Sequence, residues 1–356
     1  MNLKNLVQNE ALIEIEKHKQ CGVAISMGVG KTRLGLKYIY NKGRNLIVVP
    51  KKSIIDSWRD EIVKINIDIE LEFVTYLSLN KKNPDDYDVI VLDECHNLKM
   101  KHMDFLESYQ GYILGLTGTP PKDDIGEKYY MVNKYCPIVY RFSVDDATSA
   151  KILNDYIIYI HMLELSDNKE IRKNKKKGGH WYTSETKDYE WHCSNIENAN
   201  NHKRKQMCRI MRMKSMMSYK TKEVYTTKIL RNIDSKCIVF ANTIEQADRL
   251  CSHSYHSKNK MSNENLELFS NSKILELSCV LQLSEGISIP ELKQGIILHS
   301  YGNERKAAQR IGRLLRLNPD NTAICHILCY KNTIDETWVS NALEEFDKTK
   351  IRYING

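Results

Sequence analysis

Eight short apolar runs recur along the chain, each followed by a loop containing Gly, Pro, Ser or an acidic residue and then by a stretch with helical spacing. The runs are residues 21–26, 45–50, 87–92 and 112–117 in the first half and 236–241, 274–281, 294–300 and 323–329 in the second. Because their apolar residues do not alternate with polar ones, the runs are typical of strands that are buried on both faces. Amphipathic stretches such as 31–41, 53–65 and 243–252 predict helices between them. Alternating strands and helices predict an α/β protein with parallel sheets.

The middle of the chain interrupts this pattern and divides the eight runs into two groups. Residues 166–222, which we call the basic insertion, contain the polar stretches DNKEIRKNKKKGGHWY and HKRKQMCRIMRMKSMMSYK. The second stretch has helical spacing and a basic face, and two interpretations of it stay open: a solvated surface or a contact with nucleic acid. Its methionines are expected to pack inward. We therefore predict two domains, residues 1–148 and 149–356, with the basic insertion near the start of the second.

Composition narrows the class of protein. With 42% hydrophobic and 28% charged residues the chain is expected to be soluble and globular, and no apolar stretch is long enough to span a membrane. The N-terminus lacks the apolar core of a signal peptide, so a cytoplasmic location is expected. The 10 cysteines form no Cys-x-x-Cys pair and are expected to be reduced thiols. The histidines and cysteines between 180 and 208 match no zinc-ligand spacing. The net charge of +8 fits a polyanionic partner without identifying one.

A glycine-rich loop follows the first apolar run. In the sequence AISMGVGKT, residues 24–32, Gly28 and Gly30 let the backbone approach phosphate groups, whose oxygens the amide N–H groups can bind. The following helix N-terminus favours an anion. Lys31 supplies a positive charge for the phosphates, and the Thr32 hydroxyl is a ligand for Mg²⁺. The loop residues Met27 and Val29 complete the predicted nucleotide contact.

Two further strand ends carry groups suited to phosphate chemistry. In VIVLDECHNL, residues 89–98, the apolar run ends at Asp93 and Glu94. One acid can hold Mg²⁺ and the other can orient an attacking water. His96 follows them, and Thr117 and Thr119 belong to GLTGTP, residues 115–120, at the end of the next apolar run. We expect these three residues to couple the nucleotide site to the rest of the protein.

An arginine-rich stretch, QRIGRLLR, occupies residues 309–316. Its helical spacing places Gln309, Arg313 and Arg316 on one face. An arginine directed at the γ-phosphate stabilises transition-state charge. We predict that Arg313 and Arg316 are catalytic and that Gln309 contacts the nucleotide.

Taken in order, MGVGKT, VVPKKSIIDSW, DECH, LTGTP, SEGISIP and QRIGRLLR resemble motifs I, Ia, II, III, V and VI of superfamily-2 helicases. The resemblance covers nearly the whole chain. It is closest to small phage-type helicases and to Swi/Snf-type, restriction-motor and branch-migration relatives, because DEAD-box RNA helicases carry Ser-Ala-Thr where this chain has Thr-Gly-Thr. The resemblance implies two tandem RecA-like domains of the P-loop NTPase type, with ATP and Mg²⁺ bound to the first.

The same resemblance implies roles for residues outside the phosphate-binding loop. Gln8 is similar to a glutamine that reads adenine, and Gly286 to a residue that links the nucleic-acid strand to ATP. The implied nucleic-acid contacts are Pro50, Lys51, Lys52, Thr75 and Tyr76 in the first domain and Asn242, Ser257 and Lys258 in the second. Such contacts neutralise phosphates and carry little sequence information. The chain departs from the family at Ile25, Val280 and Ser288, where Gly, Thr and Asp are common.

The sequence thus predicts an ATP-dependent nucleic-acid motor, with a DNA helicase that unwinds or remodels DNA as the first interpretation. Three alternatives stay open: a double-stranded DNA translocase that does not separate strands, an ATP-gated clamp or motor subunit serving a nuclease partner, and an RNA helicase. DNA, as a single strand, fork or junction, is the expected partner, with replication, recombination or nuclease proteins as further candidates. The residue usage, rich in Lys, Asn and Ile, is typical of an AT-rich genome such as that of a phage.

Overall fold

The computed structural model describes residues 3–26, 28–121, 126–174, 178–280, 289–300, 322–344 and 346–356. These residues form two compact units, and the division falls between Asp155 and Tyr156. The boundary that the sequence suggests, after residue 148, lies in α6 (Val144–Ser149) of the first unit. No helix in the described ranges is both long and apolar enough to cross a lipid bilayer.

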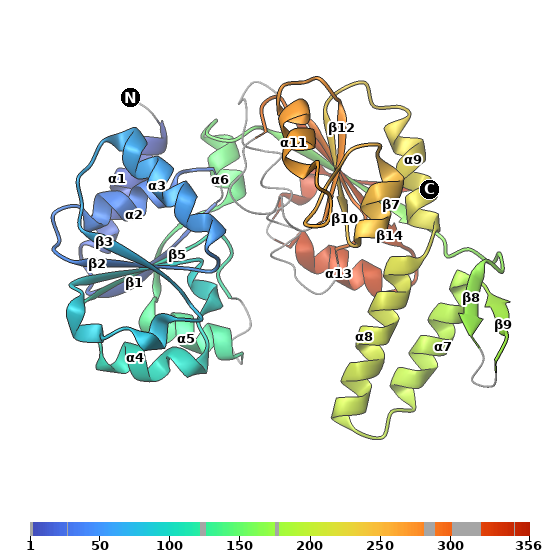
Figure 1. Ribbon diagram of the computed structural model, residues 1–356, viewed down its shortest axis with the longest axis horizontal. Coiled ribbons are helices and arrows are strands. Elements are labelled where there is room, and N and C mark those ends of the chain that lie inside the picture. Colours follow the sequence, from blue (N-terminus) through green and yellow to red (C-terminus); the bar gives the residue numbers. More distant parts are fainter. Residues whose placement is uncertain are drawn as a thin grey trace. The chain divides into compact units, whose positions relative to one another are not determined.

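Unit 1 alternates strands and helices along its whole length (Figure 1). Its elements before the acidic strand end are α1 (Leu3–Ile15), β1 (Gln20–Ile25), α2 (Lys31–Ile39), β2 (Asn45–Val49), α3 (Ser53–Ile65), β3 (Leu71–Thr75) and the 3₁₀ helices η1 (Leu79–Lys81) and η2 (Pro84–Asp86). They are followed by β4 (Val89–Asp93), η3 (Cys95–Asn97), η4 (Met100–His102), α4 (Met103–Ser108), β5 (Tyr112–Thr117), α5 (Glu127–Tyr135), β6 (Ile138–Phe142) and α6.

The strands of unit 1 form one six-stranded sheet in the order β3-β2-β4-β5-β1-β6, with parallel pairing throughout. Figure 1 shows α1, α2 and α3 on one face of this sheet and α4 and α5 on the other. The residues of β2 and β4 are all buried, as expected for strands covered on both faces. Because β5 lies between β1 and β4, the carboxyl ends of these three strands are neighbours at one edge of the sheet.

Unit 2 contains a seven-stranded sheet in the order β11-β12-β10-β13-β14-β7-β15, again parallel at every pairing. Its strands are β7 (Tyr156–Leu163), β10 (Cys237–Ala241), β11 (Ser254–Tyr255), β12 (Glu276–Val280), β13 (Gln294–Ile297), β14 (Ala323–Tyr330) and β15 (Ile351–Asn355). The helices that the structure describes in unit 2 after residue 218 are α9 (Thr221–Leu230), α10 (Ile244–Leu250), α11 (Ser262–Ser270), α13 (Ile334–Ala342) and η6 (Lys348–Lys350). The prediction of two RecA-like units with parallel sheets is confirmed.

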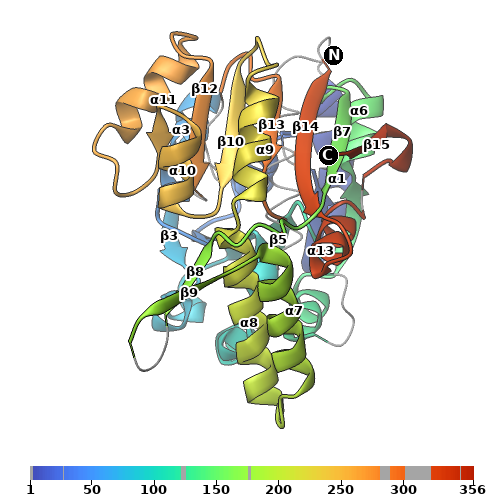
Figure 2. The same cartoon turned by 90° about the vertical axis from the view of Figure 1, so that its right-hand side faces the viewer.

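The basic insertion folds into an antiparallel hairpin, β8 (Ile171–Asn174) and β9 (His180–Thr183), followed by two helices, α7 (Glu185–Glu197) and α8 (His202–Ser218). Both views show α7 and α8 side by side, extending away from the sheet of unit 2 (Figures 1 and 2). The expected inward packing of the methionines holds for Met216, which is buried, but is wrong for Met207 and Met211, which are 62% and 46% exposed. The physical reason is that the outer part of α8 extends past the sheet and has α7 as its main neighbour.

All ten cysteines lie in described residues, and none forms a disulfide. Eight are buried and Cys193 and Cys208 are half-buried. The reduced thiols that the sequence predicts are therefore present, and they serve as small apolar core residues.

Candidate functional site

The glycine-rich loop of unit 1 connects β1 to α2. Gly28 and Gly30 have φ values of 89° and 99°, in the left-handed region that side chains with a Cβ rarely adopt. A Cβ at Gly30 would also lie 2.6 Å from Nε2 of Gln8, so glycine is required there for space as well. Helix α2 begins directly at Lys31, and the Lys31 Nζ donates to the carbonyl oxygen of Ile25 at 3.1 Å. The Lys31 side chain thus reaches from the start of α2 back to Ile25, the last residue of β1.

Gln8 joins this loop from α1. Its side chain is 2% exposed, and its Nε2 donates to the carbonyl oxygen of Val29 at 3.0 Å. Its Oε1 has no hydrogen-bond partner among the described residues. Nε2 of Gln8 therefore fixes the loop at Val29, and Oε1 is an acceptor for a further donor, such as an adenine amino group.

The acidic pair lies at the end of β4. The carboxylate of Asp93 is buried and accepts a hydrogen bond from Nε1 of Trp58 at 2.9 Å, and the carbonyl oxygen of Asp93 accepts from the Tyr76 hydroxyl at 2.9 Å. Burial and the nearby charge of Glu94 raise the pKa of Asp93 to about 6, while the Trp58 N–H and the charge of Lys31 act in the opposite direction. The influence of Lys31 on Asp93 indicates that the loop and the acidic pair belong to one electrostatic site.

Glu94 departs from ordinary backbone geometry. Its φ of 50° and ψ of 56° place a non-glycine residue in the left-handed region, which costs on the order of 1–3 kcal/mol. The Nδ2 of Asn97 donates to the carbonyl oxygen of Glu94 at 2.9 Å, which stabilises this turn. Oε2 of Glu94 is buried, lies 3.4 Å from Nδ1 of His96, and makes no hydrogen bond among the described residues. Such strain at a strand end is typical of a functional position.

His96 and Thr117 connect the ends of β4 and β5. Nδ1 of His96 and Oγ1 of Thr117 are 2.9 Å apart, and Oγ1 also accepts a hydrogen bond from the backbone N–H of Thr119 at 3.1 Å. The three predicted coupling residues therefore form one hydrogen-bonded chain beside Glu94.

The same edge of the sheet gathers buried polar atoms that lack a hydrogen bond among the described residues. They are Oε1 of Gln8, Oγ of Ser26, Oε2 of Glu94 and Oγ1 of Thr119. Ser26 follows β1, Glu94 follows β4 and Thr119 lies two residues after β5, so three neighbouring strand ends contribute. Buried polar groups in native proteins are nearly always paired. The occurrence of four such atoms here fits a polar ligand such as a nucleoside triphosphate.

The donor set also fits a magnesium ion. Thr32 lies in the first turn of α2 and Asp93 ends β4, which supplies a hydroxyl and a carboxylate of the kind that Mg²⁺ takes together with phosphate oxygens. The described residues contain no cluster of three or more His, Cys, Asp or Glu side chains suited to a metal ion. Magnesium bound through phosphate oxygens does not require such a cluster.

Trp58 and Ser26 are site residues that sequence reasoning missed. In the sequence Trp58 is an apolar position of a helix, and only the folded structure brings its indole N–H to Asp93. Ser26 could have been noticed as the polar residue that ends an apolar strand before a glycine-rich loop.

The predicted nucleic-acid residues of unit 1 lie at the carboxyl ends of β2 and β3. Lys51 and Lys52 are exposed, Pro50 and Thr75 are half-exposed, and the two strands pair as neighbours. Tyr76 differs, because it is 6% exposed and its hydroxyl is bonded to Asp93. Its side chain supports the acidic strand end and offers little surface to a nucleic acid.

In unit 2 the corresponding residues follow β10 and β11. Ser257 and Lys258 are exposed and Asn242 is half-buried. The Asn242 backbone N–H donates to Oε1 of Gln246 at 3.2 Å, and its own side-chain amide has no partner among the described residues. Predicted site residues that lie outside the described ranges are Met27, Gly286, Gln309, Arg313 and Arg316; they stay predictions from the sequence.

The fold and the arrangement at the strand ends define a P-loop NTPase with two RecA-like units. Two family models match the chain: "Type III restriction enzyme, res subunit" over residues 64–122 and "Helicase conserved C-terminal domain" over residues 219–318. These matches, together with the relatives below, support a resemblance to the superfamily-2 helicases and translocases.

A curated relative is the DNA 3'-5' translocase XPB2 of Sulfurisphaera tokodaii, which is 24% identical over an alignment of 362 positions, gaps included, that covers 92% of this chain and 82% of the relative. Among solved structures, the DNA-bound Type ISP restriction-modification enzyme LlaBIII matches 100% of this chain with a TM-score of 0.63 and 16% identity, and this chain spans only 31% of that protein. The Hef helicase domain of Pyrococcus furiosus matches 93% of this chain and 96% of its own length, with a TM-score of 0.52 and 14% identity. A putative HsdR subunit of a type I restriction enzyme from Vibrio vulnificus matches 99% of this chain and 68% of its own length, with a TM-score of 0.62 and 15% identity.

Proposed function

We propose that the chain is a DNA helicase that binds ATP on unit 1, hydrolyses it when DNA is bound, and uses the cycle to move along DNA. The observation that supports this most directly is that Lys31, which follows β1, and Asp93 and Glu94, at the end of β4, lie at the carboxyl ends of strands separated only by β5. Beside them lie buried polar atoms that make no hydrogen bond among the described residues. In this proposal unit 1 is the ATP-binding domain and unit 2 the C-terminal helicase domain, with the boundary after Asp155 in place of residue 148.

Each residue of the proposed site has a physical task. Lys31 places its ammonium against the phosphates, and the backbone N–H groups of the loop bind their oxygens. Thr32 and Asp93 would hold Mg²⁺, which would supply positive charge beside the phosphates. Glu94, with one oxygen free of hydrogen bonds, orients the attacking water. Arg313 and Arg316 stabilise the transition-state charge, a contribution of about 10³–10⁵ in rate for arginine fingers of related NTPases.

The test compares ATP hydrolysis by the intact chain with and without DNA. We expect DNA to stimulate hydrolysis, and Lys31→Ala and Glu94→Gln each to reduce turnover by at least about 10²-fold while the circular dichroism spectrum and the melting temperature stay close to those of the original protein. Lys17→Ala, a change of an exposed lysine in the same unit, is the matched control and should leave turnover unchanged. Normal turnover in the Lys31 or Glu94 variant would refute the assignment of the site.

A second candidate is a translocase that moves on double-stranded DNA without separating its strands. The name of the curated relative, a DNA 3'-5' translocase, favours this candidate. Strand displacement from partial duplexes with a 3' or a 5' tail, set beside displacement of a third strand from a triplex, separates the two candidates. Competition between DNA and RNA in the stimulation assay addresses the RNA alternative.

A further inference from the structure

The positive charge of the chain is concentrated in one segment. The basic insertion, residues 166–222, contains 15 of the 53 Lys and Arg residues but only 6 of the 45 Asp and Glu residues, which gives it a net charge of +9 against +8 for the whole chain. The rest of the protein therefore carries a net charge of −1. Because the remainder is nearly neutral, the net attraction of a polyanion to this protein comes from the basic insertion.

Helix α8 presents much of this charge to solvent. It contains six basic residues and no acidic one, and five of the six are exposed: Lys203, Arg204, Lys205, Arg209 and Lys214. The sixth, Arg212, packs against α7, where its Nη1 donates to Sγ of Cys193 at 3.4 Å. The exposed basic residues alternate around the helix with exposed Met207 and Met211.

Three of these cations stand in the first turn of α8. Lys203, Arg204 and Lys205 follow His202, the first residue of the helix, and the side chain of the N-cap Asn201 accepts a hydrogen bond from the Arg204 N–H at 2.8 Å. Basic residues at this end of a helix are opposed by the helix dipole and by one another. This arrangement costs stability in the free protein, and a bound polyanion would remove the cost.

The insertion is held rigidly at its centre by Asp188 of α7. This buried carboxylate accepts hydrogen bonds from the Ser215 and Tyr219 hydroxyls, the latter at 3.1 Å, and lies 2.7 Å from Nζ of Lys173 in β8. One side chain thus connects the β-hairpin, α7 and the end of α8.

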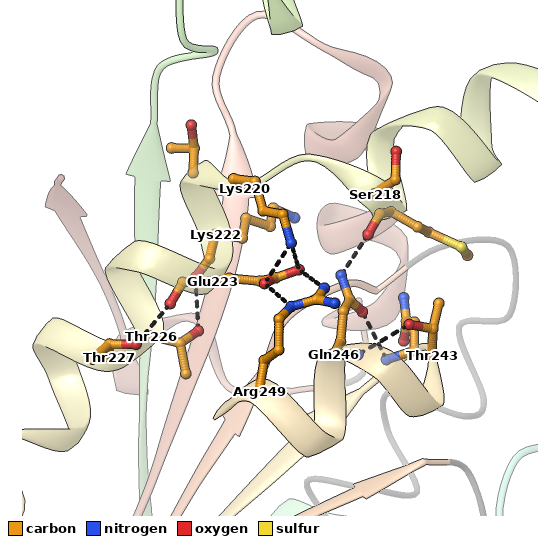
Figure 3. Close-up of polar contacts among 12 residues, drawn as sticks. Ser218, Lys220, Lys222, Glu223, Thr226, Thr227, Thr243, Gln246 and Arg249 are labelled. Atoms are coloured by element: carbon orange, nitrogen blue, oxygen red, sulfur yellow. Dashed lines mark hydrogen bonds and ion pairs between the residues drawn. The ribbon is translucent and has the colours of Figure 1, made fainter. Parts of the chain in front are cut away.

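The base of the insertion, where its two ends meet unit 2, is stabilised by Glu185 and Gln246. The Glu185 carboxylate accepts hydrogen bonds from the backbone N–H of Ser166 at 3.2 Å and of Lys220 at 2.8 Å, so it joins the two ends of the insertion. Nε2 of Gln246 in α10 donates to the carbonyl oxygen of Met217 in the last turn of α8, and its Oε1 accepts from the N–H of Asn242 (Figure 3).

Ion pairs of Glu223 and Lys222 fix α9, which begins at the last two residues of the insertion. Glu223 and Lys222 are buried, whereas Lys220 and Arg249 are exposed. Figure 3 shows the carboxylate of Glu223 between Arg249 and Lys220; the Arg249 Nε and Nη2 donate to it at 2.9 and 2.7 Å. Lys222 is fully buried against Asp335 and the carbonyl oxygens of Leu298 and Leu328. The insertion is therefore a stiff extension of unit 2. Gln246 of α10 connects it to the loop that contains Asn242.

We propose that α8 of the basic insertion binds the phosphodiester backbone of DNA, as a contact additional to those implied by the helicase motifs. The proposal rests on the proposed function, because it assumes that DNA is the polyanion. Clustered cations on a rigid support are suited to backbone contacts, which are independent of base sequence and sensitive to salt. Exposed methionines between the cations offer apolar contact to the sugars.

The test is a neutralised variant, Lys203→Gln/Arg204→Gln/Lys205→Gln, compared with Lys17→Gln/Lys273→Gln/Lys293→Gln, which removes the same charge from exposed sites outside the insertion. Affinity for fluorescent single-stranded, duplex and forked DNA is measured from 50 to 300 mM salt. We expect the slope of log affinity against log salt to become shallower by about 2 to 3 in the α8 variant, close to one per lost phosphate contact, with little change in the control. The strand form with the largest change identifies the form that α8 binds.

The melting temperature supplies an internal control. Removal of three cations from a helix N-terminus is expected to leave it unchanged or to raise it, so weaker binding cannot be attributed to unfolding. ATP hydrolysis without DNA is expected to match the original protein.

The outcomes separate this proposal from the proposed function. If DNA stimulates the original protein but both triple variants bind DNA with the same salt dependence, the role of α8 is wrong, and an acidic protein surface becomes the alternative partner. If DNA neither binds nor stimulates the original protein, the proposed function itself is wrong.

Discussion

Trp58 gives the acidic strand end its orientation. Its indole N–H is a donor to the Asp93 carboxylate, and its ring packs against Gly35 of α2, where a Cβ would lie 2.8 Å from Cη2. A helix packed on the sheet therefore sets the position of a proposed magnesium ligand. Groups that orient a ligand in this way affect metal affinity or activity by about 10–100-fold in other proteins.

We predict that Trp58→Phe raises the Mg²⁺ concentration needed for half-maximal ATP hydrolysis by about 10-fold, because Asp93 loses the donor that orients it. The melting temperature should also fall, since a buried acceptor left without its partner costs about 1–3 kcal/mol. A magnesium titration of ATP hydrolysis without DNA measures the effect, with Trp338→Phe in unit 2 as the control. An unchanged magnesium requirement would show that Trp58 has only a packing role.

We predict that Gly35→Ala is destabilising, against the usual preference of helices for alanine. The exchange normally gains about 1 kcal/mol within a helix. Here the new Cβ would lie 2.8 Å from Trp58 and 3.1 Å from Cδ1 of Leu116, and overpacking of this kind costs about 1–3 kcal/mol. Thermal unfolding should show a lower melting temperature together with reduced ATP hydrolysis, whereas Lys37→Ala on the same helix should retain both. A stabilised Gly35 variant would contradict the packing described here.

The sequence could predict the individual residues whose role follows from a local motif. Lys31, Thr32 and Asp93 stand at fixed positions relative to a strand end, so the sequence alone names them as candidates; their chemical roles stay predictions. Trp58 could not be recognised in this way, because its contact with Asp93 depends on how α3 packs on the sheet. For the same reason Tyr76, taken as a surface residue, is in fact buried under the acidic strand end.

The strands that the sequence predicts are all interior strands of the two sheets: β1, β2, β4 and β5 in unit 1 and β10, β12, β13 and β14 in unit 2. It missed the edge strands β3, β6, β11 and β15. An edge strand is covered less completely and needs no continuous apolar run, as the partly exposed pattern of LEFVT in β3 shows. It also missed the interior strand β7, in which tyrosines and His161 interrupt the apolar residues.

β7 and its neighbours contain a chain of hydrogen bonds between neutral groups. The Tyr225 hydroxyl lies 3.2 Å from Nδ1 of His161, whose Nε2 lies 2.9 Å from Nδ1 of His326; Nε2 of His326 lies 3.3 Å from Oε1 of Gln294. With both imidazoles neutral, each group in turn donates to the next. Burial lowers the pKa of both histidines to about 4, and their mutual repulsion adds to the effect at His326.

We predict that this chain makes the stability of the protein depend on pH. Because the folded pKa values lie below the unfolded value of about 6.5, the unfolded state binds more protons between pH 6.5 and 4, and the free energy of unfolding falls as the pH is lowered through this range. The free energy of unfolding, measured with urea, should fall between pH 7 and pH 5 in the original protein. In His326→Gln this fall should be smaller by about 1 kcal/mol. Equal losses in both proteins would mean that the two histidines titrate normally.

At the scale of the whole molecule, the outer part of the basic insertion, residues 194–211, is separable from the rest of unit 2. The base of the insertion depends on Glu185, Asp188 and Tyr219, all of which precede or follow the outer turns of α7 and α8. A deletion that replaces residues 194–211 with a short loop would keep this base intact, since loops of about 2–5 residues join antiparallel helices.

We predict that the protein with this deletion folds and retains ATP hydrolysis in the absence of DNA. Within residues 194–211 only Ile196 is buried, and Met207 and Met211 are exposed, so the outer turns of α7 and α8 contribute little to the core. Size-exclusion chromatography and an ATPase assay provide the measurement, with the Lys31→Ala protein as the inactive reference. Aggregation, or loss of basal hydrolysis, would show that the outer helices are part of the folding unit.

The uneven charge also has a kinetic consequence. A nearly neutral body with a strongly positive extension experiences a torque in the field of a polyanion, so diffusional encounters are biased towards collisions that begin at the insertion. Electrostatic steering of this kind raises association rates and is weakened by screening, with a Debye length of about 8 Å at physiological ionic strength. The speed of capture would then be set by residues 166–222, far along the chain from the ATP-binding loop at residues 24–32, so capture and turnover could evolve independently.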